Sequence, residues 1–455
     1  MKTLKIISLL TVWIGMVACN ASRDIPLPVE QVRPGFMGFV NPVDSAFAFD
    51  RQAPLRMHFS EPMDPATFPG NFFLWEDEEH TSSVTGSFTA EGSDILFQPD
   101  QALKKAHEYF IELRARVKDI NGNGIDKDTL LVATSEFITD GDYSQNGVPE
   151  MIVSNGSEDF LARIRLNNGR LSADTVATVA GFGRYLEMAF TSDGQWLVMT
   201  DYNSSNSGIY FFDPSDYQMV KKLDTNSDGT AVKKSAEIAV STDNIYVVNQ
   251  SSKKISVVDP GSREITAVID LPNTPKGMAV LPDGSKLYVG SGRDNTVWII
   301  DTRSNTLTKT VTINDISRCF RLTATAQGKF VAVREFAGTH LSFIDASSET
   351  VVKTIDLGYP GKSGNNNDLI AYGDYLYASS SSGELTKIDV NTQTVVQQIT
   401  DINFQGLDIY PSGEFLFAVV RKSLSEVAVV RPDDLKIVRR IRVNGSAPWD
   451  IVVRP

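Results

Sequence analysis

One position carries a charged side chain in most of the repeats of this 455-residue chain. It is the residue just before a pair of apolar residues at the start of a predicted strand, as Glu187 stands before Met188 and Phe190. Aligned in this way, the position is occupied by Glu187, Glu237, Gly277, Arg321, Asp368, Gly406 and Asp450. If the repeats surround a common axis, four carboxylates and one guanidinium converge there.

Clustered carboxylates raise one another's pKa unless a cation compensates, and such clusters in a cleft point to function. We therefore expect a ligand pocket with an acidic floor, suited to a cationic or hydrogen-bond-donating ligand or to one that arrives with a metal. Aromatic residues one or two positions earlier are expected to form its walls: Tyr185, Phe320, Phe404 and Trp449. The alternative is that exposed strand starts are simply polar.

No familiar catalytic set is present. The chain lacks a GxSxG elbow, an HExxH helix and a Walker loop, and its four histidines show no metal-ligand spacing. Cys319 stands near Arg318 and Arg321, which would lower a thiol pKa, but no histidine neighbours it in sequence. A small residue at the start of a strand is the favoured interpretation, and we assign no catalytic residue.

One segment has part of a calcium-binding pattern. Asp119, Asn121 and Asn123, followed by Gly124, match the first half of an EF-hand loop. The twelfth position of such a loop needs a glutamate, and here it is Leu130. These three residues therefore have two interpretations, a calcium site and a hydrogen-bonded Asn/Gly turn. The turn is the favoured interpretation.

The elements that position the charged column are repeats. A strand, a polar loop and a second strand recur, and the second strand ends in an aspartate at intervals of 46, 42, 44 and 44 residues. The aspartates are Asp213, Asp259, Asp301, Asp345 and Asp389, and Arg431 takes the sixth place. Four strands per period of this length predict a propeller blade. Three strands before the first full repeat and one at the C-terminus, within 449–453, would complete a seventh blade and remove open sheet edges.

The phrases PDGSKLYVG (282–290) and TVWIID (296–301) resemble the YVTN repeats of bacterial seven-bladed propellers, and the resemblance covers residues 150–455. That superfamily includes binding proteins, lactonases and electron-transfer enzymes, so it implies a fold rather than one activity. The phrases FSEPMDPATF (59–68) and YFIELRARVKDINGNGID (109–126) resemble the bacterial Ig-like family of envelope proteins. This second resemblance covers 35–139 and implies a spacer or adhesion module, with 140–149 as a linker.

The N-terminus has the features of an export signal. Lys2 and Lys5 precede an apolar run that ends in Met16-Val17-Ala18-Cys19, which resembles the lipobox of bacterial lipoproteins. The resemblance implies a signal peptide at 1–18, a lipidated Cys19 and a tether at 19–34, and Asn20 favours the outer membrane. The alternative is an ordinary cleaved signal with an incidental cysteine.

These features predict an all-β protein, with an Ig-like β-sandwich followed by a seven-bladed β-propeller closed by strands from both ends. The formal charge of −13 argues against nucleic acid as a partner. We expect a lipid-anchored cell-envelope protein that binds a ligand without catalysis, either a nutrient passed to an outer-membrane transporter or a cell-surface partner. A lactonase-type enzyme and a structural or adhesive protein are the alternatives.

Overall fold

The computed structural model describes residues 33–125, 130–141, 150–155, 160–178, 186–202, 207–358, 368–380, 382–400, 402–421, 425–445 and 448–455. Cys19, the predicted tether up to residue 32 and Tyr185 lie outside these residues. The described chain is all-β, as predicted, with one short 3-10 helix, η1 (Pro65–Thr67). Within it, no helix is long and apolar enough to cross a membrane.

The N-terminal domain is a sandwich of two four-stranded sheets, with strand orders β1-β3-β6-β5 and β2-β8-β7-β4. Its strands alternate between core and surface: in β3, Leu55, Met57 and Phe59 are buried whereas Arg56 and His58 are not. The strands are β1 (Phe36–Asn41), β2 (Ala46–Phe49), β3 (Leu55–Phe59), β4 (Phe72–Trp75), β5 (Gly86–Glu91), β6 (Asp94–Pro99), β7 (Glu108–Arg114) and β8 (Leu131–Thr139).

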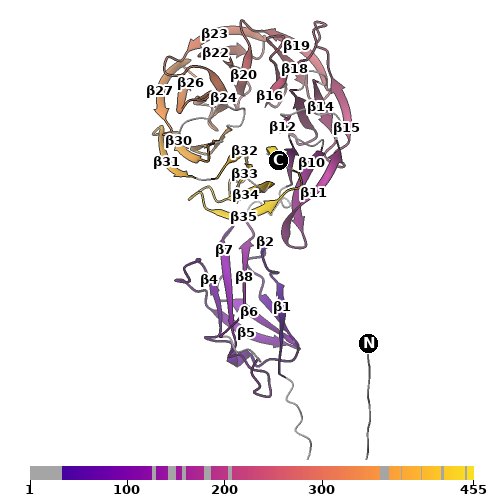
Figure 1. The fold of residues 1–455 in the computed structure, drawn as a ribbon, viewed down its shortest axis with the longest axis vertical. Helices are drawn as coiled ribbons and strands as arrows, with labels where there is room; N and C mark the ends of the chain where they lie inside the picture. Colours follow the sequence, from indigo (N-terminus) through magenta and orange to yellow (C-terminus); the bar gives the residue numbers. More distant parts are fainter. Residues whose placement is uncertain are drawn as a thin grey trace, which may run out of the picture.

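The rest of the described chain forms seven four-stranded sheets arranged as a ring (Figure 1). Six of them take four consecutive strands each. These strands are β12 (Leu186–Phe190), β13 (Leu197–Asp201), β14 (Gly208–Phe212), β15 (Met219–Leu223), β16 (Ser235–Val240), β17 (Ile245–Asn249), β18 (Lys254–Asp259), β19 (Glu264–Asp270), β20 (Pro275–Val280), β21 (Lys286–Ser291), β22 (Thr296–Asp301), β23 (Thr306–Thr312), β24 (Cys319–Ala324), β25 (Phe330–Glu335), β26 (His340–Asp345), β27 (Thr350–Asp356), β28 (Leu369–Tyr372), β29 (Tyr375–Ser379), β30 (Leu385–Asp389), β31 (Thr394–Ile399), β32 (Phe404–Ile409), β33 (Leu416–Arg421), β34 (Ser425–Val430) and β35 (Ile437–Arg442).

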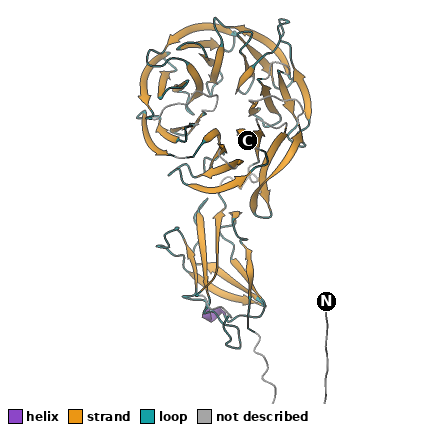
Figure 2. Cartoon of the chain, in the orientation of Figure 1, coloured by secondary structure: helices purple, strands orange, loops and turns teal. Residues whose placement is uncertain are grey.

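The remaining sheet joins the two ends of the propeller region. It contains β9 (Met151–Asn155), β10 (Phe160–Asn167) and β11 (Arg170–Thr178), with the last strand, β36 (Pro448–Val453), paired antiparallel to β9. The first strands of the other sheets and β36 are the inner strands of the ring. Each inner strand contacts the next, and β36 contacts both β32 and β12. The predicted joining of the two ends in one sheet is therefore present, and Figure 2 shows strands around the whole ring.

The middle strands of the sheets are apolar on both faces. Every residue of β17 is buried, because each sheet packs against a neighbour on both sides, whereas the outer strand β23 is mostly exposed. The recurring aspartate closes the turn between the third and fourth strands. One carboxylate oxygen of Asp301 accepts a hydrogen bond from the Ser304 backbone N–H at 2.8 Å. The repeat signature is therefore turn chemistry.

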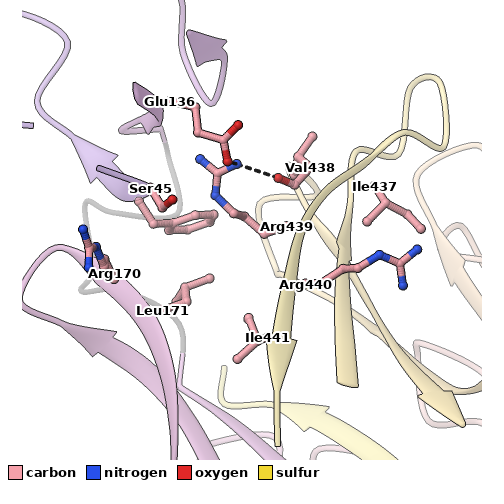
Figure 3. A pocket seen from close by; sticks show the side chains of 10 residues that line it. Ser45, Glu136, Arg170, Leu171, Ile437, Val438, Arg439, Arg440 and Ile441 are labelled. Atoms are coloured by element: carbon pink, nitrogen blue, oxygen red, sulfur yellow. Dashed lines mark hydrogen bonds and ion pairs between the residues drawn. The ribbon is translucent and has the colours of Figure 1, made fainter. Parts of the chain in front are cut away.

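The Ig-like domain contacts the propeller through β35. The Arg439 guanidinium donates to Glu108 at 2.8 Å and to Glu136 at 2.9 Å, and Figure 3 shows Arg439 extended toward Glu136. The rings of Phe47 and Phe415 pack beside this pair, 5.2 Å apart. Burial raises the pKa of Glu108, and the Arg439 guanidinium opposes that shift.

We predict that Arg439→Gln will destabilise the protein by about 2 kcal/mol, because it leaves the buried Glu108 carboxylate with only the more distant Lys436. Urea unfolding followed by tryptophan fluorescence measures the change. Arg440→Gln is the matched control, since Arg440 pairs with Glu426 at a more exposed site. Equal effects of the two substitutions would contradict the assigned role of Arg439.

Candidate functional site

The charged side chains of the predicted column lie around one pocket at the centre of the ring. The pocket has a volume of about 410 Å³, and its charged lining residues are Glu187, Glu237, Arg321, Asp368, Asp408 and Asp450. Apolar residues of β12, β32 and β36 continue the lining toward the ends of these inner strands. We call this cavity the carboxylate pocket.

A pairing irregularity brings most of the column toward the axis. The register of the inner strand shifts between Ser235 and Ile238 around Glu237, and a corresponding shift occurs around Asp450. Similar shifts lie next to Arg321, Gly277 and Gly406. Such bulges re-aim side chains, and they are frequent next to functional sites.

Arg321 is the centre of an ion-pair cluster across the channel. Its guanidinium donates to both carboxylate oxygens of Glu187, with Nη1–Oε2 at 3.1 Å, and to Oε1 of Glu237 at 2.6 Å. Asp368 lies at 3.9 Å from its Nε. Arg321 belongs to β24 whereas the two glutamates belong to β12 and β16, so the cluster connects different sheets of the ring.

The aspartates of the pocket have a different role. Asp450 accepts hydrogen bonds from its neighbour Ile451 N and from Met188 N in the next sheet, both at 2.9 Å. Asp368 does the same for Leu369 and Leu407, both at 2.8 Å. Each aspartate therefore connects the inner strand of its own sheet to the backbone of the next one. A glutamate side chain is one methylene longer than an aspartate. Glu187 and Glu237 therefore reach the Arg321 guanidinium rather than the backbone of the next strand.

The two glycines of the column lie where neighbouring inner strands approach most closely. A Cβ on Gly277 would collide with the Phe320 carbonyl oxygen, and a Cβ on Gly406 would lie 2.8 Å from the Asp450 Cα. A side chain at either place would push two inner strands apart. These positions are thus glycine for steric reasons.

The electrostatics of the pocket follow from burial and crowding. Burial raises the pKa of Glu237 to about 8; the Arg321 guanidinium opposes this shift and the Glu187 carboxylate adds to it. Burial also raises the pKa of Asp450 well above its ordinary value, helped by repulsion from Glu187 and Asp368. Burial disfavours charge on Arg321, but Glu187, Glu237 and Asp368 outweigh this and hold its pKa above its ordinary value. Glu237 Oε2 is buried and has no hydrogen-bond partner among the described residues.

Asp408 belongs to the same pocket, and the sequence analysis missed it. Its carboxylate accepts from Ile409 N at 2.8 Å and from Val453 N, on β36, at 2.7 Å. Burial raises its pKa to about 7. The available signal was an acidic residue between the apolar residues Leu407 and Ile409, whereas the alignment considered only the residue before such a pair.

The expected aromatic walls are not in this pocket. Phe404 is fully buried in a core cluster between sheets, and Trp449 is buried as well. Phe320 lines a different cavity, and Tyr185 lies outside the described residues. The reason is that neighbouring residues of a strand point to opposite sides, so Phe320 and Trp449 face away from Arg321 and Asp450. The register shift between Phe404 and Leu407 has the same effect for Phe404.

The two other residue groups singled out in the sequence have ordinary surroundings. Asp119 accepts hydrogen bonds from the backbone N–H groups of Asn121 and Asn123, at 2.9 and 2.7 Å, and from the Asn123 side-chain amide. This geometry is that of a hydrogen-bonded turn, and residues 126–129 of the predicted calcium loop lie outside the described residues. Cys319 is buried, and burial raises the pKa of its thiol to about 12, which leaves it unreactive.

Comparison with known proteins supports the fold of both regions. Residues 32–139 match the bacterial Ig-like domain family. The N-terminal region is therefore a bacterial Ig-like domain. Residues 187–284, which include Glu187 and Glu237, match the glutamine cyclotransferase family. None of the curated proteins matches this chain.

Several solved structures resemble the chain at low identity. A Bacteroides fragilis protein provisionally assigned as a 6-phosphogluconolactonase is 16% identical, with a TM-score of 0.52 over 67% of this chain and 97% of that one. A dihydro-heme d1 dehydrogenase is 13% identical, with a TM-score of 0.49 over 86% of this chain and 77% of that one. The β-propeller domain of Cps50 (Swd1) from Myceliophteria thermophila is 12% identical, with a TM-score of 0.48 over 58% and 87% of the two chains. At 16% identity, the likeness to the Bacteroides fragilis protein is one of fold alone.

We predict that the carboxylate pocket makes stability depend on pH. An Asp408 pKa raised from its ordinary value to about 7 means that folded protein keeps a proton that unfolded protein releases. Unfolding free energy should therefore fall as pH rises from about 4 to about 7, and Asp408→Asn should make this slope shallower by up to about 1.4 kcal/mol per pH unit.

Urea unfolding at closely spaced pH values measures both slopes. Asp301→Asn is the control, because hydrogen bonds from Ser304 lower the pKa of Asp301 and its linkage acts only at more acidic pH. Identical slopes for wild type and Asp408→Asn between pH 4 and 7 would refute the assignment.

Proposed function

We propose that this protein binds a small ligand bearing a cationic or hydrogen-bond-donating group in the carboxylate pocket. The observation that carries the proposal is the charge of the lining: five carboxylates and one guanidinium surround one cavity in the described residues. A cation placed there would relieve the repulsion that helps to raise the carboxylate pKa values.

Glu237 is the side chain we assign to direct ligand contact. Its Oε1 accepts from Arg321, while its Oε2 is buried without a partner, so one oxygen remains for a donor on the ligand. An unpaired buried acceptor is costly, and a ligand N–H or O–H would recover that cost. The aspartates are less suited to this role because their oxygens already accept backbone hydrogen bonds.

Putrescine is the probe, because it is a small dication that fits the volume of the pocket. We predict that isothermal titration calorimetry at pH 8 will detect putrescine binding, and that Glu237→Gln will weaken it at least tenfold, about 1.4 kcal/mol. Glu264→Gln, on the exposed outer strand β19, is the matched control and should leave binding unchanged. The neutral isostere 1,4-butanediol should bind much more weakly. Equal affinity of wild type and Glu237→Gln for putrescine would rule out the assigned role of Glu237.

Glutaminyl cyclisation is a second candidate function, favoured by the family match over residues 187–284. In that reaction the α-amine of an N-terminal glutamine attacks its own side-chain carbonyl carbon, a five-membered lactam forms and ammonia leaves. The pocket would receive the amine, and Glu237, whose pKa is raised, would take the proton that the attacking amine loses and then give it to the departing ammonia. Ammonia release from the dipeptide Gln-Ala, lost in Glu237→Gln, would establish catalysis; putrescine binding without ammonia release would establish binding alone.

We also propose that the protein is anchored in the outer membrane through a lipid on Cys19, with the Ig-like domain as a spacer below the propeller. The support is the sequence from Lys2 to Cys19. Cys19→Ser should move the protein from the membrane fraction to the soluble fraction of the producing cells, as measured by immunoblotting. Ala21→Ser, two residues away, is the control. Membrane association that persists in Cys19→Ser would exclude the lipid anchor.

A further inference from the structure

A second pocket, of opposite charge, lies at the starts of the inner strands β20 and β24. Its volume is about 210 Å³. It is lined by Tyr202, Gln250, Thr274, Lys276, Gly292, Arg293, Arg318, Cys319, Phe320 and Phe336. These residues stand at the starts of β20 and β24 and just after the ends of β13, β17, β21 and β25, whereas the carboxylate pocket extends to the C-terminal ends of β12 and β36. The two pockets share no lining residue.

Three cationic side chains line this second pocket: Lys276, Arg293 and Arg318. No carboxylate is among its lining residues, and no ion pair of these three cations is found in the described residues. Burial lowers the pKa of Lys276, and the nearby Arg321 guanidinium lowers it further, while Glu237 and Glu187 oppose the shift. The whole chain has a formal charge of −13, so this group of cations without ion pairs is a local exception. An anion bound in the cleft would stabilise it.

Aromatic rings form the rest of the recognition surface. Phe320 and Phe336 pack with their ring centroids 5.0 Å apart. The Lys276 ammonium lies 5.1 Å from the Phe320 ring centre, and the Arg318 guanidinium lies 4.1 Å from that of Phe336. These cation–π contacts hold the charges at the pocket without neutralising them. Phe320 is buried, with 1% of its surface exposed, so Phe336 supplies the accessible apolar surface beside the positive charge.

The ion-pair cluster of Arg321 separates the two pockets. Arg321 follows Phe320 directly on β24, and the two side chains point to different cavities. The Glu187 and Glu237 carboxylates form their ion pairs with Arg321 and act on Lys276 without forming an ion pair, and no ion pair of Arg293 or Arg318 is found in the described residues. The two pockets therefore differ in the sign of their charged lining residues.

We propose that this second pocket binds an oxyanion, a carboxylate or a phosphate, carried on a planar apolar group. Arg318 and Arg293 pair with the oxyanion through charged hydrogen bonds, and Phe336, which packs on the buried Phe320, contacts the planar group. A cavity of this size admits one ring with its anionic substituent. The inference does not depend on the proposed function of the carboxylate pocket.

Benzoate and phenyl phosphate are the probes, and benzyl alcohol is the neutral analogue. Calorimetric titration of the full protein at low ionic strength should show that at least one of the two anions binds at least tenfold more tightly than benzyl alcohol. Whichever anion binds more tightly identifies the preferred oxyanion. Benzyl alcohol binding as tightly as both anions, or no binding of either anion at millimolar concentration, would overturn the proposal.

Arg318→Gln should weaken binding of the anion at least fivefold, because it removes one charge partner of the oxyanion. Phe336→Leu tests the aromatic contact separately and should also weaken it. The control is Arg303→Gln, at an exposed turn after β22, which should leave affinity unchanged. Glu237→Gln should not weaken anion binding, since Glu237 lines only the carboxylate pocket. Unchanged affinity in Arg318→Gln, or a loss in Glu237→Gln, would refute a separate anion site.

Discussion

The inner strand of each sheet has one edge that faces the channel, and its backbone groups there have no partner strand. Buried N–H groups without acceptors are costly, so the ring needs acceptors where neighbouring inner strands meet. Asp368, Asp408 and Asp450 supply them by bonding backbone N–H groups of the next inner strand. Gly277 and Gly406 permit the same close approach by the absence of a side chain. Much of the central polar chemistry is therefore a consequence of closing the ring.

Because the acceptors for these backbone N–H groups are carboxylates, they concentrate negative charge on the channel axis. Three aspartates and two glutamates crowd around one cavity, and burial pushes the pKa values of Asp408, Asp450 and Glu237 upward. Arg321 offsets part of this charge by pairing with the glutamates. Lys276, Arg293 and Arg318 line a separate pocket and have no ion pair among the described residues, although Glu237 and Glu187 act on Lys276. The result is two pockets of opposite charge, one acidic and one basic and aromatic.

The repeat pattern predicted much of this arrangement, because both strand alternation and the turn aspartates are local properties. The joining of β36 to β9 followed from counting strands, and the position of Glu187, Glu237, Arg321, Asp368 and Asp450 followed from aligning them. The prediction for Phe320, Phe404 and Trp449 was wrong because these side chains point away from the pocket, whereas Tyr185 lies outside the described residues. The register shifts in the inner strands decide that direction, and they depend on pairing with the neighbouring strand, which sequence spacing does not reveal. Asp408 was missed for a related reason, since its role depends on the distant N–H of Val453.

The division of roles within the column indicates where function resides. Replacing an aspartate would remove backbone hydrogen bonds between sheets, so these residues are explained by the fold. Glu187 and Glu237 instead accept hydrogen bonds from the Arg321 guanidinium. A buried ion-pair cluster is weak support for stability, because apolar residues of similar volume are often as stabilising or more so. Glu237 adds a buried oxygen without a partner, which burial alone would disfavour. The ligand proposed for the carboxylate pocket would supply a hydrogen-bond donor to this Glu237 oxygen and so offset the cost of burying it.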